Sequence, residues 1–124
     1  MLDGGWGLLD GMNDVGLAVS LTFGGRFVQA PGLDIIALRY LLETCDTVGE
    51  TLAKLATMPI SIPQNVTLVD AEHAVTVYTG PDIAMTTAPD ACATNHQHLP
   101  VPDEQEQFTR TQERLSAVRP EVWS

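Results

Sequence analysis

Two runs of alternating, β-branched residues joined by a short polar turn constrain the fold of this chain more than any other feature. The runs span 65–71 and 74–80, with Glu72 and His73 between them. β-Branched residues favour strands, and alternation places the apolar side chains on one face of a sheet. The sequence therefore predicts an antiparallel hairpin in its second half.

A second hairpin is predicted near the N-terminus. The apolar runs 6–10 and 16–23 are separated by a polar group in which Asn13, Asp14 and Gly16 supply turn chemistry. Shorter strands are expected around 83–87 and 92–95. The chain thus supplies at least two pairs of neighbouring antiparallel strands.

Helical periodicity occupies the segment between the two hairpins. Asp34 is a plausible N-cap for a first helix. The capping-box spacing of Thr47 and Glu50 predicts that a second helix begins almost at once. The apolar positions of the first helix recur every three or four residues, at Ile35, Leu38, Leu42 and Cys45.

The rest of the chain completes an α+β pattern. Pro59 and Pro63 exclude a helix between the second helix and the central hairpin. A last helix is predicted over 104–118, with Phe108, Leu115 and Val118 on one face. Strands segregated from helices indicate an α+β fold with a largely antiparallel sheet, and 124 residues suffice for one domain.

Charge excludes several classes of partner. Sixteen acidic residues against six basic ones give a formal charge of −10, and the basic residues are scattered. Nucleic acid and anionic membrane surfaces would be repelled. The sequence shows no membrane-spanning run and no signal peptide, so we expect a cytoplasmic protein.

Few residues suggest metal or thiol chemistry. His96 and His98 could lie on one strand face, with Cys92 nearby, but nothing fixes a complete ligand set, so a small metal-binding domain is the weakest hypothesis. We expect no metal and no cofactor. Cys45 falls on an apolar helix stripe, as a structural thiol would. Asn13 is, on local chemistry, a turn residue.

Four segments in one order resemble the acyl-coenzyme A:6-aminopenicillanic acid acyltransferase family, relatives of the choloylglycine hydrolases. They are Trp6–Leu21, with its Gly-Met-Asn turn, Leu38–Val48, Asn65–Asp70, and Ala93-Thr94-Asn95-His96. The resemblance covers 6–98, which we interpret as the family-like core of a single partial domain spanning 1–124. Residues 99–124 are interpreted as a polar linker and C-terminal helix.

The resemblance implies an N-terminal nucleophile hydrolase with an αββα sandwich, of which this chain would form part, with helices on one face of antiparallel sheets. Such enzymes free a cysteine by cutting a Gly-Cys bond, and the thiol then attacks an amide or thioester. Asn95 matches the Asn of the oxyanion hole. Thr22 stands where choloylglycine hydrolases carry another active-site Asn, and Asn13 is a candidate substrate-binding residue.

The nucleophile that the family requires is missing from these residues. Thr44 precedes Cys45, Ala91 precedes Cys92, and no Gly-Cys pair occurs. The resemblance therefore implies the central fragment of an amidohydrolase or acyltransferase, inactive alone, which would act on a small acylated amide or thioester if completed. The alternative is a non-catalytic binding or assembly protein that retains half of the fold.

An incomplete sandwich would leave apolar strand residues in water. We expect such a face to drive self-association or pairing with a complementing chain. The alternative is a self-contained α+β domain whose helices cover one face and whose other face is polar, as the alternation at Thr67, Thr76 and Tyr78 allows. The residues expected at an uncovered face are Leu8, Val19, Leu21, Leu68 and Val77.

Overall fold

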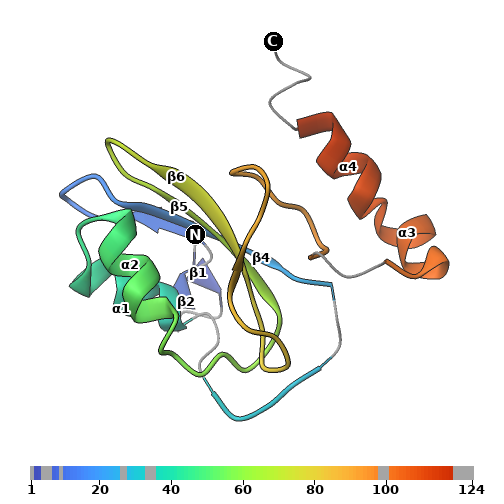
Figure 1. Cartoon of the computed structure of the whole chain (residues 1–124), viewed down its shortest axis with the longest axis horizontal. Helices are drawn as coiled ribbons and strands as arrows, with labels where there is room; N and C mark the ends of the chain where they lie inside the picture. The colour runs from blue at the N-terminus through green and yellow to red at the C-terminus, as the bar shows by residue number, and fades with distance from the viewer. Residues whose placement is uncertain are drawn as a thin grey trace.

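The computed structural model of the chain describes residues 2–3, 7–8, 10–25, 28–32, 36–97 and 101–118. Within these residues a five-stranded antiparallel sheet has the order β3-β4-β5-β6-β7, and helices lie to either side of it (Figure 1). The class is α+β, as predicted. The five strands are β3 (Asp10–Met12), β4 (Ala18–Phe23), β5 (Gln64–Val69), β6 (Ala74–Thr79) and β7 (Thr86–Thr87).

The central hairpin, β5 with β6, is confirmed. Its register pairs Gln64 with Thr79 and Val69 with Ala74. Asp70 closes the turn, because its Oδ1 accepts hydrogen bonds from the backbone N–H groups of Glu72 (2.8 Å) and His73 (2.7 Å). A carboxylate that accepts its own turn's amides is a standard way to stabilise so short a connection.

The first predicted strand is divided between two sheets. Its residues 7–8 form β2 (Gly7–Leu8), which pairs with β1 (Leu2–Asp3). Asp10 instead begins β3, which pairs with β4. Trp6 and Leu9 lie outside the described residues. The N-terminal hairpin of the main sheet is therefore β3–β4, with the predicted turn between them.

Both predicted helices after this hairpin are present, as α1 (Ile36–Thr44) and α2 (Val48–Leu55). Asp34 and Ile35 lie outside the described residues. Thr47 is confirmed as the N-cap of α2, since its hydroxyl accepts from the Glu50 N–H at 3.2 Å, while the Glu50 carboxylate contacts that hydroxyl at 3.4 Å. Asp70 adds a tertiary cap, because its Oδ2 accepts from the Val48 N–H at 2.8 Å.

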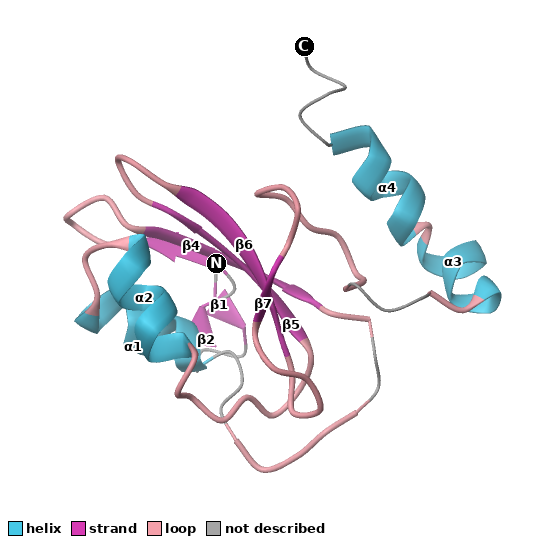
Figure 2. Cartoon of the chain, viewed as in Figure 1, coloured by secondary structure: helices cyan, strands magenta, loops and turns pink. Residues whose placement is uncertain are grey.

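Helices α1 and α2 cover one face of the sheet and bury the core there (Figure 2). The prediction of an uncovered apolar face is therefore wrong for the strand residues whose side chains are described. Val19, Leu68 and Val77 are at most 1% exposed, and Leu21 is half-buried against the same core. The helices cover them because both present apolar stripes to the sheet. The side chain of Leu8 lies outside the description.

The segment after β6 departs from the sequence prediction at two places. Only Thr86–Thr87 of the expected strand 83–87 pairs with β6, and 92–95 forms no strand. The expected helix 104–118 is broken into α3 (Asp103–Thr109) and α4 (Thr111–Val118). No described helix is long or apolar enough to span a membrane.

The break between α3 and α4 lies at Arg110, whose φ is +53°. The carboxylate of Glu106 accepts the first backbone amides of α4, from Gln112 at 2.9 Å and Glu113 at 3.4 Å. This cap stabilises a new helix start in place of a continuous helix. The predicted common apolar face is thereby lost: Leu115 is buried, Val118 is exposed and Phe108 is 90% exposed.

Candidate functional site

Asn95 lies on the loop of residues 94–97, between β7 and α3, with its side-chain amide held at both ends. Its Nδ2 donates to the Phe23 carbonyl at 3.0 Å, and its Oδ1 accepts from the Arg114 guanidinium at 2.7 Å. Its backbone N–H donates to the Thr111 hydroxyl. An amide NH₂ has two hydrogens. Among the described residues only Phe23 accepts one of them, so the second remains available to a ligand.

Two residues of the sheet hydrogen bond to the backbone of the 94–97 loop. Asn65 of β5, which is buried, donates through Nδ2 to the carbonyls of Thr94 and His96, both at 2.9 Å. The hydroxyl of Thr22 donates to the same Thr94 carbonyl at 3.0 Å. The single donor of Thr22 is therefore used to hold the loop that carries Asn95.

Helix α4 also binds the loop, through its first residue, Thr111. Thr94 Oγ1 lies 2.7 Å from the Thr111 carbonyl and 2.8 Å from its hydroxyl, and His96 Nδ1 lies 2.9 Å from that hydroxyl. Farther along, Gln97 donates through Nε2 to the carbonyls of Thr79 (2.8 Å) and Gln64 (3.2 Å). Together these contacts fix the conformation of the 94–97 loop. A hydrogen-bond donor carried by such a loop is pre-organised before any ligand binds.

The end of β4 approaches the loop so closely that a side chain would not fit. Gly25 has a φ of +84°, and a Cβ built there would overlap the Asn95 carbonyl oxygen. Its own carbonyl accepts from Gln105 Nε2 of α3 at 2.7 Å. Gly25 therefore permits β4, the 94–97 loop and α3 to meet at one point.

A pocket of about 460 Å³, here named the α3 pocket, opens beside this meeting point. One wall comes from the end of β4, a second from the loop, and the third from one face of α3. Asn95 is thus a wall residue of a pocket that also carries two aromatic rings. The α3 pocket is lined by Phe23, Gly25, Asn95, Glu104, Gln105, Phe108 and Thr109.

Asn13 lies at the opposite end of β4 and is not brought to the α3 pocket. Its Nδ2 donates to the carbonyls of Leu42 (3.1 Å) and Cys45 (2.7 Å) at the end of α1. Its Oδ1 accepts from the N–H groups of Val15 (3.2 Å) and Leu17 (3.0 Å). Both hydrogens of its amide thus satisfy helix carbonyls that would otherwise lack a partner.

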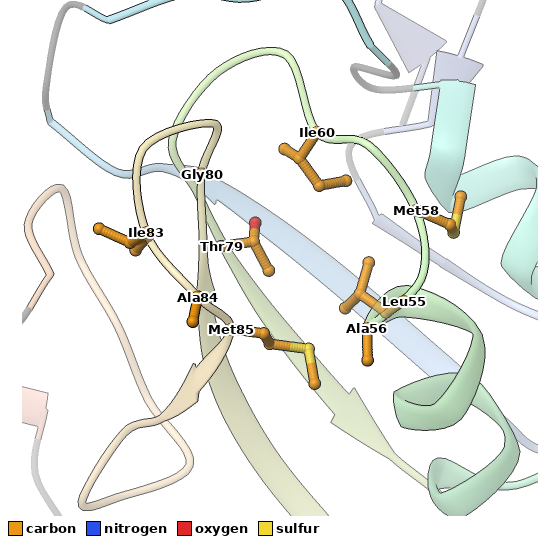
Figure 3. Close-up of a pocket in the computed structure, with 9 residues that line it drawn as sticks. All are labelled: Leu55, Ala56, Met58, Ile60, Thr79, Gly80, Ile83, Ala84 and Met85. Atoms are coloured by element: carbon orange, nitrogen blue, oxygen red, sulfur yellow. The ribbon is translucent and has the colours of Figure 1, made fainter.

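A second pocket, of about 290 Å³, lies between the end of α2 and the strand β6 (Figure 3). Its nine labelled residues include Leu55, Met58, Ile60 and Met85, and none of the nine carries a titratable side chain. The Thr79 hydroxyl there donates to the Gln64 carbonyl. This pocket is an extension of the core and offers no reactive group.

The residues of the metal hypothesis do not gather. His96 contacts threonines, Cys92 is half-buried, and His98 lies outside the described residues. His73 stands in the central turn, 3.7 Å from Asp70. In the described part of the chain, no three His, Cys, Asp or Glu side chains are placed to hold a metal ion.

One of the two arginines next to the site, Arg110, forms an ion pair with Glu113 of α4. Arg110 donates to both carboxylate oxygens of Glu113, at 2.7 and 2.6 Å. This bond raises the pKa of Arg110 and lowers the pKa of Glu113. Arg114 is the arginine that reaches Asn95, and its Nε also donates to the Thr109 carbonyl at 3.0 Å.

Sequence reasoning named Asn95 but missed its supports. Asn65 was visible only as the first residue of a strand, and Arg114 only as one of six scattered basic residues. Their contacts with the 94–97 loop and Asn95 join residues 19 to 31 positions apart. No local spacing signals such a pair.

The comparisons with known proteins give one match. The family model for acyl-coenzyme A:6-aminopenicillanic acid acyl-transferase matches residues 4–120. No curated protein and no solved structure gives a significant match. The match covers nearly the whole chain, including every residue of the site around Asn95. This protein therefore belongs to the acyl-coenzyme A:6-aminopenicillanic acid acyl-transferase family.

Proposed function

We propose that the chain supplies the oxyanion-stabilising part of an N-terminal nucleophile amidohydrolase or acyltransferase that acts on amide or thioester acyl groups. The observation that carries this function is the fixed amide of Asn95, with one N–H free beside a pocket. Donors that are fixed before the reaction stabilise a developing negative charge at no cost of reorganisation. Family membership supports the reaction class.

The nucleophile of this reaction comes from polypeptide outside these 124 residues. Neither Cys45 nor Cys92 follows a glycine, and Cys45 is only 1% exposed. In the proposed step the sulfur of an N-terminal cysteine bonds to the carbonyl carbon, and its proton passes to the α-amino group. The carbonyl electron pair moves to oxygen, which accepts a hydrogen bond from the free N–H of Asn95. The α-amino group then gives the proton to the departing amine or thiol, and its expulsion leaves the acyl-enzyme.

The face of the sheet opposite α1 and α2 is polar along its central strands. Alternation along the strands puts Ser20, Thr67 and Thr76 on the face opposite α1 and α2. The hydroxyls of Thr67 and Thr76 hydrogen bond to each other at 2.7 Å. In the proposed αββα sandwich a second sheet, from the polypeptide that carries the nucleophile, would pack on this face, whereas a polar second face is also what a self-contained α+β domain predicts.

A non-catalytic binding protein is the second candidate function. It is favoured by the closed core, since α1 and α2 already bury the apolar strand residues Val19, Leu68 and Val77. A chain with a closed core has no need of a partner to cover it. In the completed assembly the first function predicts catalysis, whereas the second function predicts none.

The deciding experiment measures turnover with and without the missing nucleophile. The 124-residue chain alone should hydrolyse no N-acyl amide or acyl thioester. Joined to or mixed with the polypeptide that carries the Gly-Cys pair, it should be active, and Asn95→Ala should lower kcat by about 10²–10³. Gln29→Ala, which removes an exposed amide that does not line the α3 pocket, is the control and should leave kcat unchanged. An unchanged kcat in Asn95→Ala with a lowered Tm would assign Asn95 to structure alone.

A further inference from the structure

We infer that the ring of His96 carries a proton on Nδ1, and that this N–H, acting through Thr111, positions Asn95. The tautomer follows from the hydrogen-bond network that joins the 94–97 loop to the first residue of α4. Its catalytic consequence rests on the proposed function, in which Asn95 donates to the oxyanion. His96 thereby becomes a positioning residue for that donor.

The hydroxyl of Thr111 lies at the centre of this network. Its oxygen is 2.6 Å from the Asn95 backbone nitrogen, 2.8 Å from Thr94 Oγ1 and 2.9 Å from His96 Nδ1. Thr111 is 0% exposed, so these three neighbours share the hydroxyl in place of solvent. A hydroxyl donates one hydrogen bond and accepts two. The three contacts therefore use its whole capacity, and only one of them can take its hydrogen.

The partners of the network fix where each hydrogen goes. The Asn95 backbone N–H can only donate, so Thr111 Oγ1 accepts it. Thr94 gives its hydroxyl hydrogen to the Thr111 carbonyl at 2.7 Å, because a carbonyl can only accept. The contact between the two threonine hydroxyls then uses the hydrogen of Thr111. No hydrogen of Thr111 is left for His96, so Nδ1 of His96 is the donor in their contact.

The opposite tautomer leaves one close contact without a hydrogen. With a bare Nδ1, the Thr111 hydroxyl would turn toward His96. The oxygens of Thr94 and Thr111 would then face each other at 2.8 Å with lone pairs only, unless Thr94 gave up the Thr111 carbonyl. The 3.4 Å approach of Thr94 Oγ1 to His96 Nδ1 is too long to compensate. Buried polar groups pay most for an unmade hydrogen bond, so the network selects Nδ1–H.

Thr111 passes this constraint to Asn95 along two routes. Its hydroxyl accepts the Asn95 backbone N–H directly. Thr111 is also the first residue of α4, and Arg114 of the same helix donates to Asn95 Oδ1 at 2.7 Å. Repulsion between the hydroxyls of Thr94 and Thr111 would push the start of α4 from the loop and shift both contacts of Asn95. The Nδ1–H of His96 prevents that repulsion.

The backbone of His96 is held independently of its ring. Asn65 donates to the carbonyls of His96 and Thr94, both at 2.9 Å, and Thr22 donates to the Thr94 carbonyl at 3.0 Å. A substitution of the His96 side chain leaves these anchors of the loop in place. Variants at this position therefore test the ring itself.

Nuclear magnetic resonance of the 124-residue chain tests the tautomer without catalysis. The ring nitrogens of isotope-labelled histidine are observed near pH 8.5, above the ordinary histidine pKa of about 6.5. The signals of His96 are those that His96→Asn removes. We expect a hydrogen bonded to Nδ1 that exchanges slowly with water, because Thr111 is buried. A folded chain in which Nδ1 of His96 is bare would overturn the inference.

Steady-state kinetics of the completed enzyme test the positioning. His96→Asn keeps an amide N–H close to the place of Nδ1, whereas His96→Gln carries its amide farther out, near the place of Nε2. We expect His96→Gln to lower kcat by about tenfold to a hundredfold with KM nearly unchanged, because a slightly displaced donor loses transition-state contact. His96→Asn should recover most of kcat. The control is His73→Gln, the same change at a histidine whose side chain is 68% exposed, and it should leave kcat unchanged.

The kinetic outcomes separate His96 from the proposed function. Equal kcat in His96→Gln and His73→Gln, or no recovery in His96→Asn, would refute the positioning role when all variants are measured well below their Tm. A kcat that Asn95→Ala leaves unchanged counts against the proposed function itself. A kcat that Asn95→Ala lowers and His96→Gln does not counts against His96 alone.

Discussion

The Arg114 guanidinium donates to the side-chain oxygen of Asn95 at 2.7 Å, while the nitrogen of the same amide is held by the Phe23 carbonyl. Two contacts on opposite ends of an amide fix its rotation. A cation at the oxygen also draws electron density from the nitrogen and strengthens its remaining N–H as a donor. Arg114 is therefore a positioning residue for Asn95.

Arg114→Ala should lower kcat of the completed enzyme by about tenfold to a hundredfold with little change in KM, because a donor misplaced by a fraction of an ångström loses transition-state contact. Arg110→Gly is the control, since it removes a neighbouring arginine and keeps the positive φ. Steady-state kinetics of both variants decide. A lowered Tm with normal kcat in Arg114→Ala would limit Arg114 to a structural role.

Gly25→Ala should destabilise the fold more than Gly16→Ala. Both glycines have positive φ, +84° and +93°, so each substitution carries the backbone cost of about 1–2 kcal/mol. At Gly16 a new Cβ meets nothing within 4 Å, whereas at Gly25 it overlaps the Asn95 carbonyl oxygen. Urea unfolding of the two variants measures the difference, and equal losses would show that the close approach of loop and strand is absent in solution.

Asn13→Ala should destabilise the chain by about 1–3 kcal/mol, because it leaves the carbonyls of Leu42 and Cys45 without their donor. Asn13→Asp keeps the acceptor for Val15 and Leu17 but places a negative charge at the carboxyl end of α1, where it is unfavourable. It should therefore not rescue stability. Chemical denaturation checks both, and full stability of Asn13→Asp would contradict this account.

Stability should fall in acid partly through Asp70. The hydrogen bond from the Val48 backbone, followed by those from Glu72 and His73 and the charge of His73, lowers the pKa of Asp70 in the folded state. Its contribution is complete above the unfolded pKa of about 3.9 and is lost as pH falls through the lower folded value.

Thermal melts across pH 2–7 test this assignment. Asp70→Ala should lower Tm at neutral pH and flatten the acid limb of the profile. Asp14→Ala, at an exposed turn position, is the control and should keep the acid limb of the parent chain. An unchanged acid limb in Asp70→Ala would mean that other carboxylates govern acid unfolding.

Local patterns determined the elements whose stabilising contacts are close in sequence. The hairpin of β5 and β6 follows from alternation and an Asp-led turn, and the start of α2 from the Thr47–Glu50 spacing. The division of 104–118 into two helices escaped prediction, because it depends on Glu106 capping α4 across the Arg110 break.

The sequence by itself also singled out Asn95, through a short motif within a longer resemblance. Only the tertiary structure decided what holds and surrounds it: Arg114 on its oxygen, Phe23 on its nitrogen, and Asn65 beneath its loop. The tertiary structure also leaves Phe108 in solvent beside a pocket, whereas periodicity had predicted it on one helical face with Leu115 and Val118. The reason is physical, since periodicity records which face a side chain takes on its own element, whereas a site depends on contacts between elements distant in sequence.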